Sequence, residues 1–227
     1  MPFEDIALLV PVLLFSIVAH EYAHGEAAYR QGDTTAYMLG RLTLNPLKHI
    51  DPVMTIILPA VLILSHAPFV FGAAKPVPVN PRNYRRYVRG DIIVSLAGIA
   101  TNLVLFLISA IVFAFVGAIA HALGGAPSGL ELLQRMMFWG MYINLILACF
   151  NLIPIPPLDG SHVLKQALPT AAGMRYRQLY AFGIIPILLV MWLLPGVINV
   201  FMWPGIQLMG LALQLLSPLA LPGAIPT

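Results

Sequence analysis

The stretch 20–24, HEYAH, contains the residue types best suited to chemistry in this chain. It follows an apolar run, residues 6–19, that predicts a membrane-buried helix. Positions i and i+4 of a helix lie one above the other on the same face, so His20 and His24 can offer two imidazole nitrogens to one metal ion. Glu21 lies beside them and can reach a water on that metal. The H-E-x-x-H spacing is typical of zinc-dependent peptide hydrolysis, in which the Glu is a base and not a ligand.

The apolar surroundings of the motif also indicate a functional site. A glutamate and two histidines are costly in an apolar membrane helix, and ionisable groups at such a depth by default indicate function. The alternative is a polar cluster that only pins helices together. We therefore predict a catalytic metal site near the end of the first helix.

The composition is that of a polytopic membrane protein. Of 227 residues, 59% are hydrophobic and 9% are charged, and the mean hydropathy is +0.88; a soluble domain of this size does not need so little charge. We predict an all-α polytopic membrane protein with about five transmembrane helices, a re-entrant or interfacial segment and a short strand region. Residues 1–227 would form one membrane-embedded domain, with a core at 5–165 and C-terminal apolar helices at 179–216.

Apolar runs and helix-breaking residues place the expected elements. Membrane helices are predicted at about 5–29, 91–121, 130–150, 179–194 and 197–216, the last two divided by Pro195 and Gly196. The segment 36–44 alternates weakly and is broken by Gly40, so we predict a short strand pair or irregular segment there. An exposed strand edge at this segment could bind an extended peptide.

A catalytic zinc with two histidine ligands needs a third protein ligand. The single cysteine, Cys149, excludes a cysteine-based site. Asp159 is the best-placed acid, because the proline-rich segment 151–158 ends a helix and stiffens the chain before it. Three other acids lie in or beside basic loops and are expected to be solvated partners of Lys or Arg: Asp33, Asp51 and Asp91. The other histidines are expected at the membrane interface: His49, His66, His121 and His162.

The position of Asp159 constrains the topology. If Asp159 meets His20 and His24, the apolar run 53–74 must cross the membrane twice or not at all, since a single crossing would put the ligands at opposite faces. Its prolines, Pro59 and Pro68, suit a re-entrant or interfacial hairpin buried against protein.

The distribution of charge gives an independent indication of orientation. With this topology, eleven of the twelve Lys and Arg residues fall on one side, and only Arg135 lies near the other. The positive-inside rule makes the crowded side cytoplasmic, so the basic residues indicate topology rather than nucleic-acid binding. His20 follows Ile6 by about 21 Å of helix rise in a core about 30 Å thick. We expect a multi-pass protein of the cell membrane whose metal site lies within the bilayer toward the cytoplasmic side.

Three motifs resemble those of the site-2 protease family of intramembrane zinc metalloproteases. They are HEYAH at 20–24, Gly98-x-x-x-Asn102, and NLIPIPPLDG at 151–160, and they span about residues 15–160 in the family's order. The resemblance is to a compact form without a helix before the first motif and without an inserted peptide-binding domain.

The resemblance implies a role for each motif residue. The implied ligands of one Zn²⁺ per chain are His20, His24 and Asp159. Glu21 would be the catalytic base. Asn151 would help to position substrate or stabilise the oxyanion, and Asn102 is carried over as a catalytic-site residue. The implied substrate is a transmembrane segment of another protein in the lipid bilayer.

Other classes of protein make different demands on the sequence. A non-catalytic relative that binds membrane helices would have lost a ligand or the base, and none is lost here. A zinc or proton transporter would have more acids and histidines lining several helices. The membrane zinc proteases that trim prenylated proteins usually take a Glu on a later helix as third ligand. The only Glu on a later helix here, Glu131, lies beyond the wrong end of that helix. The oligomeric state is left open.

Overall fold

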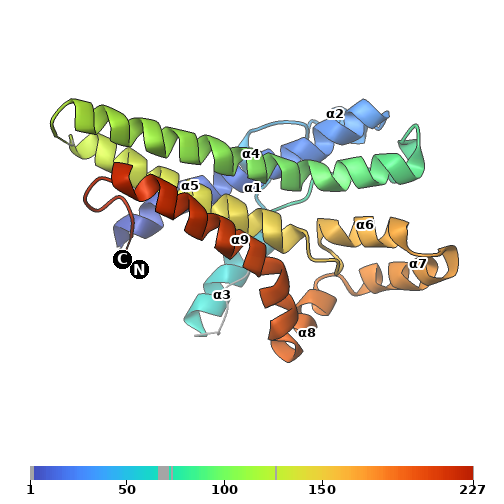
Figure 1. The fold of residues 1–227 in the computed structure, drawn as a ribbon. Helices are drawn as coiled ribbons and strands as arrows, with labels where there is room; N and C mark the ends of the chain where they lie inside the picture. The colour runs from blue at the N-terminus through green and yellow to red at the C-terminus, as the bar shows by residue number, and fades with distance from the viewer. Residues whose placement is uncertain (1–2, 66–71, 73, 126, 227) are drawn as a thin grey trace.

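Long apolar helices form the body of the molecule. The computed structural model describes residues 3–65, 72, 74–125 and 127–226. Four helices of this part of the chain are long and apolar enough to cross a membrane (Figure 1): α1 (Phe3–Gln31), α4 (Tyr87–Ala122), α5 (Ser128–Asn151) and α9 (Pro195–Leu216). The expectation of a helical membrane protein with several spans is confirmed.

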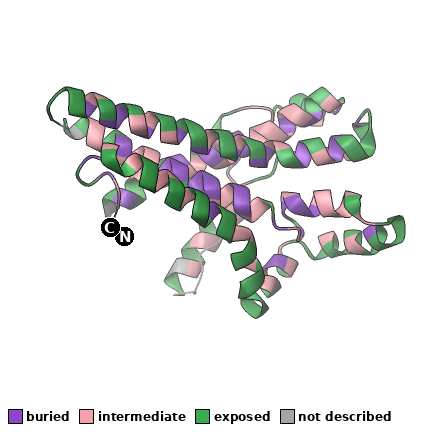
Figure 2. Cartoon of the chain, in the orientation of Figure 1, coloured by how far each residue is buried: buried purple, intermediate pink, exposed green. Residues whose placement is uncertain are grey.

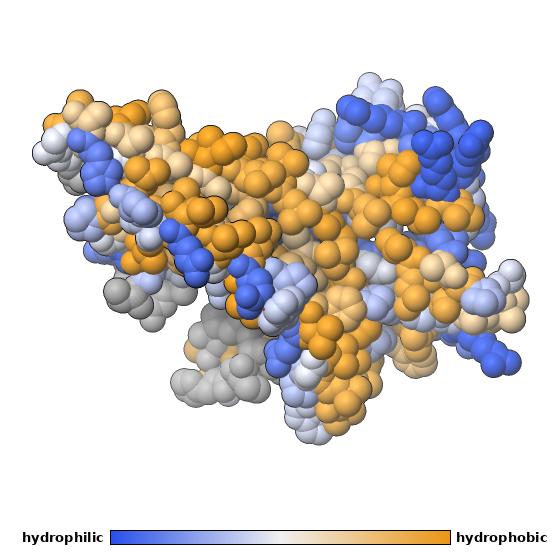
Figure 3. Space-filling view, viewed as in Figure 1, coloured by the Kyte–Doolittle hydropathy of each residue, from blue (hydrophilic) through white to orange (hydrophobic). Residues whose placement is uncertain are grey.

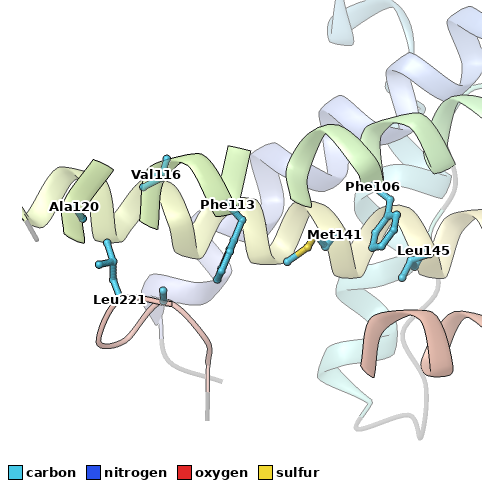
Figure 4. Packing of buried hydrophobic residues seen from close by; sticks show 8 residues of the cluster. Phe106, Phe113, Val116, Ala120, Met141, Leu145 and Leu221 are labelled. Carbon is cyan, nitrogen blue, oxygen red and sulfur yellow. The ribbon is translucent and has the colours of Figure 1, made fainter. Parts of the chain in front are cut away.

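The main core lies where α4 and α5 pack as an antiparallel hairpin. Phe106 and Phe113 of α4 meet Met141 and Leu145 of α5, and Leu221 from the C-terminal tail covers one end of this cluster (Figure 4). α1 packs on both helices, and α9 packs on α5. Buried residues follow these contacts, whereas the outer faces of α4 and α9 are exposed (Figure 2).

Exposed apolar side chains cover the long helices, as a lipid-facing surface requires. Figure 3 shows hydrophobic residues over most of this face, and hydrophilic residues gathered where α1 ends and α4 begins. Exposed large hydrophobic residues of α4 include Leu107, Ile111 and Phe115.

In the described part of the apolar run 53–74, the helical pieces are short. A π-helical turn, Pro52–Ile57, leads into α3, Leu58–Leu64; together these 6 and 7 residues rise about 20 Å, too little for a core of about 30 Å. The amide of Lys75 donates to the carbonyl of His49 at 2.8 Å, so the two ends of the run lie together. His66 and Pro68 lie outside the described residues.

The C-terminal third is more broken than the sequence predicted. After α6 (Asp159–Ala167) and α7 (Thr170–Arg177), the run 179–194 begins as a 3₁₀ turn, Gln178–Phe182, and continues as α8 (Ile185–Leu193). The segment Thr170–Phe182, which joins α7 to this turn, and α8 are bent by 92° relative to each other, and Gly183 adopts a positive φ of 56° between them. The described residues therefore hold four candidate spans, or five if this bent pair counts as one.

The strand region predicted at 36–44 was wrong: the described residues contain no strand, and α2 (Thr35–Met38) begins this segment. Asp33 accepts the amide of Thr35, and after α2 the amides of Gly40 and Arg41 donate back to the carbonyls of Tyr37 and Ala36. Gly40 has φ +62°. This is the Schellman end of a helix, so the glycine that was read as a strand breaker is a helix stop.

Asp33 ties the end of α1 to the extended segment that follows residue 74. Its Oδ1 accepts from the amide and hydroxyl of Thr35 and from the side chain of Asn83, and its Oδ2 accepts from the amide of Asn80. The carboxylate is buried, not solvated as expected. Burial acts to raise the pKa of Asp33, but the hydrogen bonds from Asn80, Thr35 and Asn83 outweigh it and lower that pKa below its usual value.

We expect Asp33→Asn to loosen this junction. An asparagine has one acceptor oxygen, so its amide would face the Asn80 or Thr35 donors, at a cost on the order of 1–3 kcal/mol. Because the folded pKa of Asp33 is lowered, its contribution is present above about pH 4 and disappears as the pH falls through that lowered pKa. Melting temperatures in detergent at pH 7 measure the effect. Asp51→Asn is the control: one oxygen of Asp51 accepts both Val53 and Met54 amides, and Asn caps a helix equally well.

Candidate metal centre

Two turns of α1 and the start of α6 bring together three side chains that can bind a metal. His20 Nε2 lies 3.1 Å and His24 Nε2 lies 3.3 Å from Oδ2 of Asp159. The two imidazole nitrogens are 3.0 Å apart. These three residues are close enough to bind one metal ion, and within the described residues they form the only such group of three.

A tight return after α5 places Asp159. The amide of Ile153 donates to the carbonyl of Phe150, and the amide of Leu158 donates to that of Ile155, so the chain folds back on itself before α6 begins. Gly160 has no room for a side chain, because a Cβ there would meet the carbonyl oxygen of Leu152. Asp159 is the first residue of α6, so its carboxylate also lies at the positive end of a helix.

A chain of side-chain amides fixes the orientation of His20. Asn144 of α5 donates to the carbonyl of Gly140, so its oxygen faces Asn102 and accepts from the amide nitrogen of that residue. The oxygen of Asn102 then faces His20 Nδ1 at 2.5 Å. Asn144 also donates to Ser16 at 3.0 Å. The Gly140 carbonyl can only accept a hydrogen bond, and this fixes which group donates in each bond of the series. His20 must therefore donate from Nδ1.

His24 is held in the same tautomer by the backbone of α4. Its Nδ1 lies 2.7 Å from the carbonyl oxygen of Val94, which can only accept. Both neutral rings therefore carry their proton on Nδ1 and present the lone pair of Nε2, which is the form that binds metal.

This arrangement fits a cation. Two Nε2 lone pairs and Asp159 Oδ2 face one another, and the buried oxygen has no hydrogen-bond partner among the described residues. Ligand atoms about 2.0–2.1 Å from a tetrahedral zinc lie about 3.3 Å apart, close to the observed 3.0–3.3 Å. α4 leaves room for the rings at Gly98, where a Cβ would come within 2.5 Å of His20 and 2.6 Å of His24.

The three side chains open into a cavity of about 410 Å³ that Glu21 and Asn151 also line. Glu21 Oε2 accepts the amide of Val77 at 2.7 Å, which holds the carboxylate against the extended segment after residue 74. Asn151 is the last residue of α5 and uses one N–H to bond the carbonyl of Leu147. The sequence-predicted site residues thus lie around one cavity, except Asn102, which lies behind His20.

Sequence reasoning missed part of the surroundings. Asn144 and Ser16 were not singled out; both are polar positions inside apolar helices, which is the signal that could have identified them. Asp91 was expected to be solvated but is buried, and it pairs with Lys165 at 2.7 Å. Asp51 caps the turn at Pro52 instead of pairing with a base.

The remaining candidates do not join the three donors. His49 is buried and bonds the carbonyl of Thr43, and His121 is exposed at the far end of α4. His162 lines the cavity but bonds Asp91. Glu131 is in the first turn of α5, at the opposite end from Asn151. His66 lies outside the described residues.

The fold and these side chains define a helical membrane metalloprotease. The model of Peptidase family M50 matches residues 8–194, and the chain belongs to this family, that of the site-2 proteases. It is 36% identical to "Putative zinc metalloprotease YwhC" of Bacillus subtilis over 89% of this chain and 87% of that protein. It is 34% identical to "Putative zinc metalloprotease Rip2" of Mycolicibacterium smegmatis over 81% of this chain and 66% of that protein. No solved structure matches the chain.

The close approach of α4 predicts that Gly98→Ala disrupts metal binding. The new methyl group would overlap both imidazole rings and move Nε2 of His20 or His24 out of position. We expect the purified variant to lose most of its zinc, measured as zinc per chain. Gly210→Ala on α9, where a Cβ meets nothing within 4 Å, is the control and should keep its zinc. Equal zinc content in the two variants would contradict the fit of the rings against α4.

Proposed function

We propose that this chain is an intramembrane zinc metalloendopeptidase that cleaves transmembrane segments of other membrane proteins. The observation that carries the proposal is the convergence of His20, His24 and Asp159 between apolar helices. Membership of a peptidase family supports peptide hydrolysis. His20 and His24 stand on α1 and pack against α4, two helices that could span a membrane, and this position supports a substrate within the bilayer.

We assign the ion to His20 and His24 of α1 and to Asp159 of α6. When bound there, a zinc ion would act as a Lewis acid that lowers the pKa of water and polarises a carbonyl group. Glu21, one residue along from His20 and lining the same cavity, takes the proton of the attacking water and later passes it to the leaving amine. Its Oε2 is held by the Val77 amide, and among the described residues its Oε1 has no partner, so one oxygen stays free for the proton.

The two asparagines act at different places. Asn151 lines the cavity and has a second N–H beyond the one that bonds Leu147, so it can donate to the developing oxyanion. A donor of this kind is typically worth about 3 kcal/mol. Asn102 touches His20 on the side away from the cavity and acts through that ring. It is a positioning residue: it keeps Nε2 of His20 unprotonated.

The substrate must present an extended backbone. A transmembrane helix has every peptide group hydrogen-bonded within itself, so a scissile carbonyl is reached only after local unwinding. Helix-breaking residues near the cut should therefore favour cleavage.

The core that holds the site falls within residues 5–165, and α9 of the C-terminal region packs against α5 to complete one membrane-embedded unit.

We expect Glu21→Gln to keep the fold and the zinc and to lose cleavage. Glutamine has nearly the shape of glutamate but cannot accept the proton, and general-base catalysis contributes typically 10²–10⁴-fold. The measurement is cleavage of a synthetic transmembrane peptide in proteoliposomes, with zinc content determined on the same sample.

Glu26→Gln on the next turn of α1 is the matched control for that experiment. Glu26 pairs with Arg30 at 2.8 Å and does not line the cavity of the metal centre, so its loss should leave cleavage near the wild-type rate. Cleavage by Glu21→Gln at the wild-type rate would contradict the assignment of Glu21 as the base. Absence of zinc from the wild-type protein would instead contradict the metal-dependent mechanism.

The basic residues support a site that opens toward the cytoplasm. An exposed group of arginines lies between the extended segment and the first turns of α4, at the end of the molecule that carries the metal centre: Arg82, Arg85, Arg86 and Arg89. The positive-inside rule places such residues in the cytoplasm.

Cysteine labelling in intact cells tests this orientation. Cys149 is buried and gives little background. We expect Leu123→Cys, exposed at the far end of α4, to react with a membrane-impermeant maleimide, and Arg85→Cys to react only after the cells are lysed. The reverse pattern would place the metal centre toward the outer face.

A further inference from the structure

Asp91 is a buried carboxylate that binds three side chains of one short helix. It lies in the second turn of α4 and is 2% exposed. Its Oδ1 is 3.0 Å from His162 Nδ1, and its Oδ2 is 2.7 Å from Lys165 Nζ and 2.5 Å from Gln166 Nε2. All three partners belong to α6, the helix that begins with Asp159.

The spacing of these partners places them on the same face of α6 as the metal-binding carboxylate. Counted from Asp159, His162 and Gln166 stand at i+3 and i+7, on the same side of the helix. Lys165, at i+6, lies at the edge of that side and reaches Asp91 with its long side chain. Asp91, His162 and Asp159 also line the same cavity. The contact with Asp91 therefore fixes both the rotation of α6 about its axis and its distance from α4.

α6 cannot hold this position by itself. It has nine residues, and helices shorter than about 12–15 residues are marginal without tertiary contacts. His20 and His24, in contrast, stand on a 29-residue helix packed along α4 and α5. The third ligand is the one whose place depends on an outside anchor.

We propose that Asp91 is a positioning residue for metal binding: through His162, Lys165 and Gln166 it sets α6 so that the Asp159 carboxylate meets the two histidines. The inference rests on the proposed ligand role of Asp159. Asp91 has no hydrogen bond or ion pair with the three donor residues, and it acts through the placement of α6.

The affinity for zinc, measured on the purified full chain by competition with a chromophoric chelator, tests this role. We expect Asp91→Asn to weaken zinc binding about 10–100-fold, the range typical when a partner that orients a ligand is removed. Asp159→Asn should weaken it further. Gln166→Leu removes one of the three bonds and should show a smaller loss in the same direction, and it decides the question if Asp91→Asn does not fold.

Asp5→Asn is the matched control for general loss of stability. Asp5 is equally buried, at 1% exposed, and accepts from Arg135 at 2.8 Å and Trp139 at 3.1 Å near the start of α1. This variant should lower the melting temperature and leave the zinc affinity unchanged, whereas a purely structural role for Asp91 would give the same pattern in both variants.

Two outcomes separate the failure of this inference from the failure of the proposed function. Zinc affinity within twofold of wild type in folded Asp91→Asn, or in Gln166→Leu if the first does not fold, combined with loss in Asp159→Asn, would overturn the role of Asp91 alone. Wild-type affinity in Asp159→Asn would overturn the ligand assignment, and the role of Asp91 with it.

Discussion

The site depends on one face of α4, the helix that contributes no ligand. Asp91, Val94, Gly98 and Asn102 follow one another at intervals of three or four residues and so lie along one side of the helix. The carbonyl of Val94 orients His24, Asn102 orients His20, and Asp91 binds the helix that carries Asp159. Gly98, between them, provides the space for both rings. The three proposed ligands come from α1 and α6, but their geometry is set by α4.

The low polarity of the surroundings explains why the buried polar side chains form connected series of hydrogen bonds within the protein. Lipid and packed apolar side chains offer no replacement hydrogen bonds, so each buried polar group needs a partner within the protein. The amides of Asn102 and Asn144 satisfy each other and end at a backbone carbonyl and a serine. Among the described residues, four buried side-chain atoms have no hydrogen-bond partner, and one of them is the oxygen of Asp159 that faces the two histidines. In such apolar surroundings, a buried carboxylate oxygen without a partner is costly unless a cation binds it.

The sequence was informative where spacing along one helix, or a rigid local segment, carries the information. His20 and His24 follow from the i, i+4 rule, and the prolines before Asp159 predicted the end of α5, although the segment that they stiffen is a tight return and not extended. The strand at 36–44 failed because weak alternation was weighted above a helix stop at Gly40. Asp91 and Asn144 could not be placed, because their partners are 74 and 42 residues away. Their pairing depends on how α4 meets α6 and α5, which no local pattern encodes.

The C-terminal region also bears on the site, through the segment around Asp159. Tyr176 of α7 donates to the carbonyl of Pro154 at 2.8 Å, and Tyr180 lies 2.6 Å from the hydroxyl of Ser161 on α6. These contacts tie α6 and the preceding return to α7 and the turn that follows it. A nine-residue helix between two such anchors can keep its first carboxylate in register with α1. The bent region 170–193 therefore does more than add apolar surface, because it gives α6 a second set of contacts besides those with Asp91.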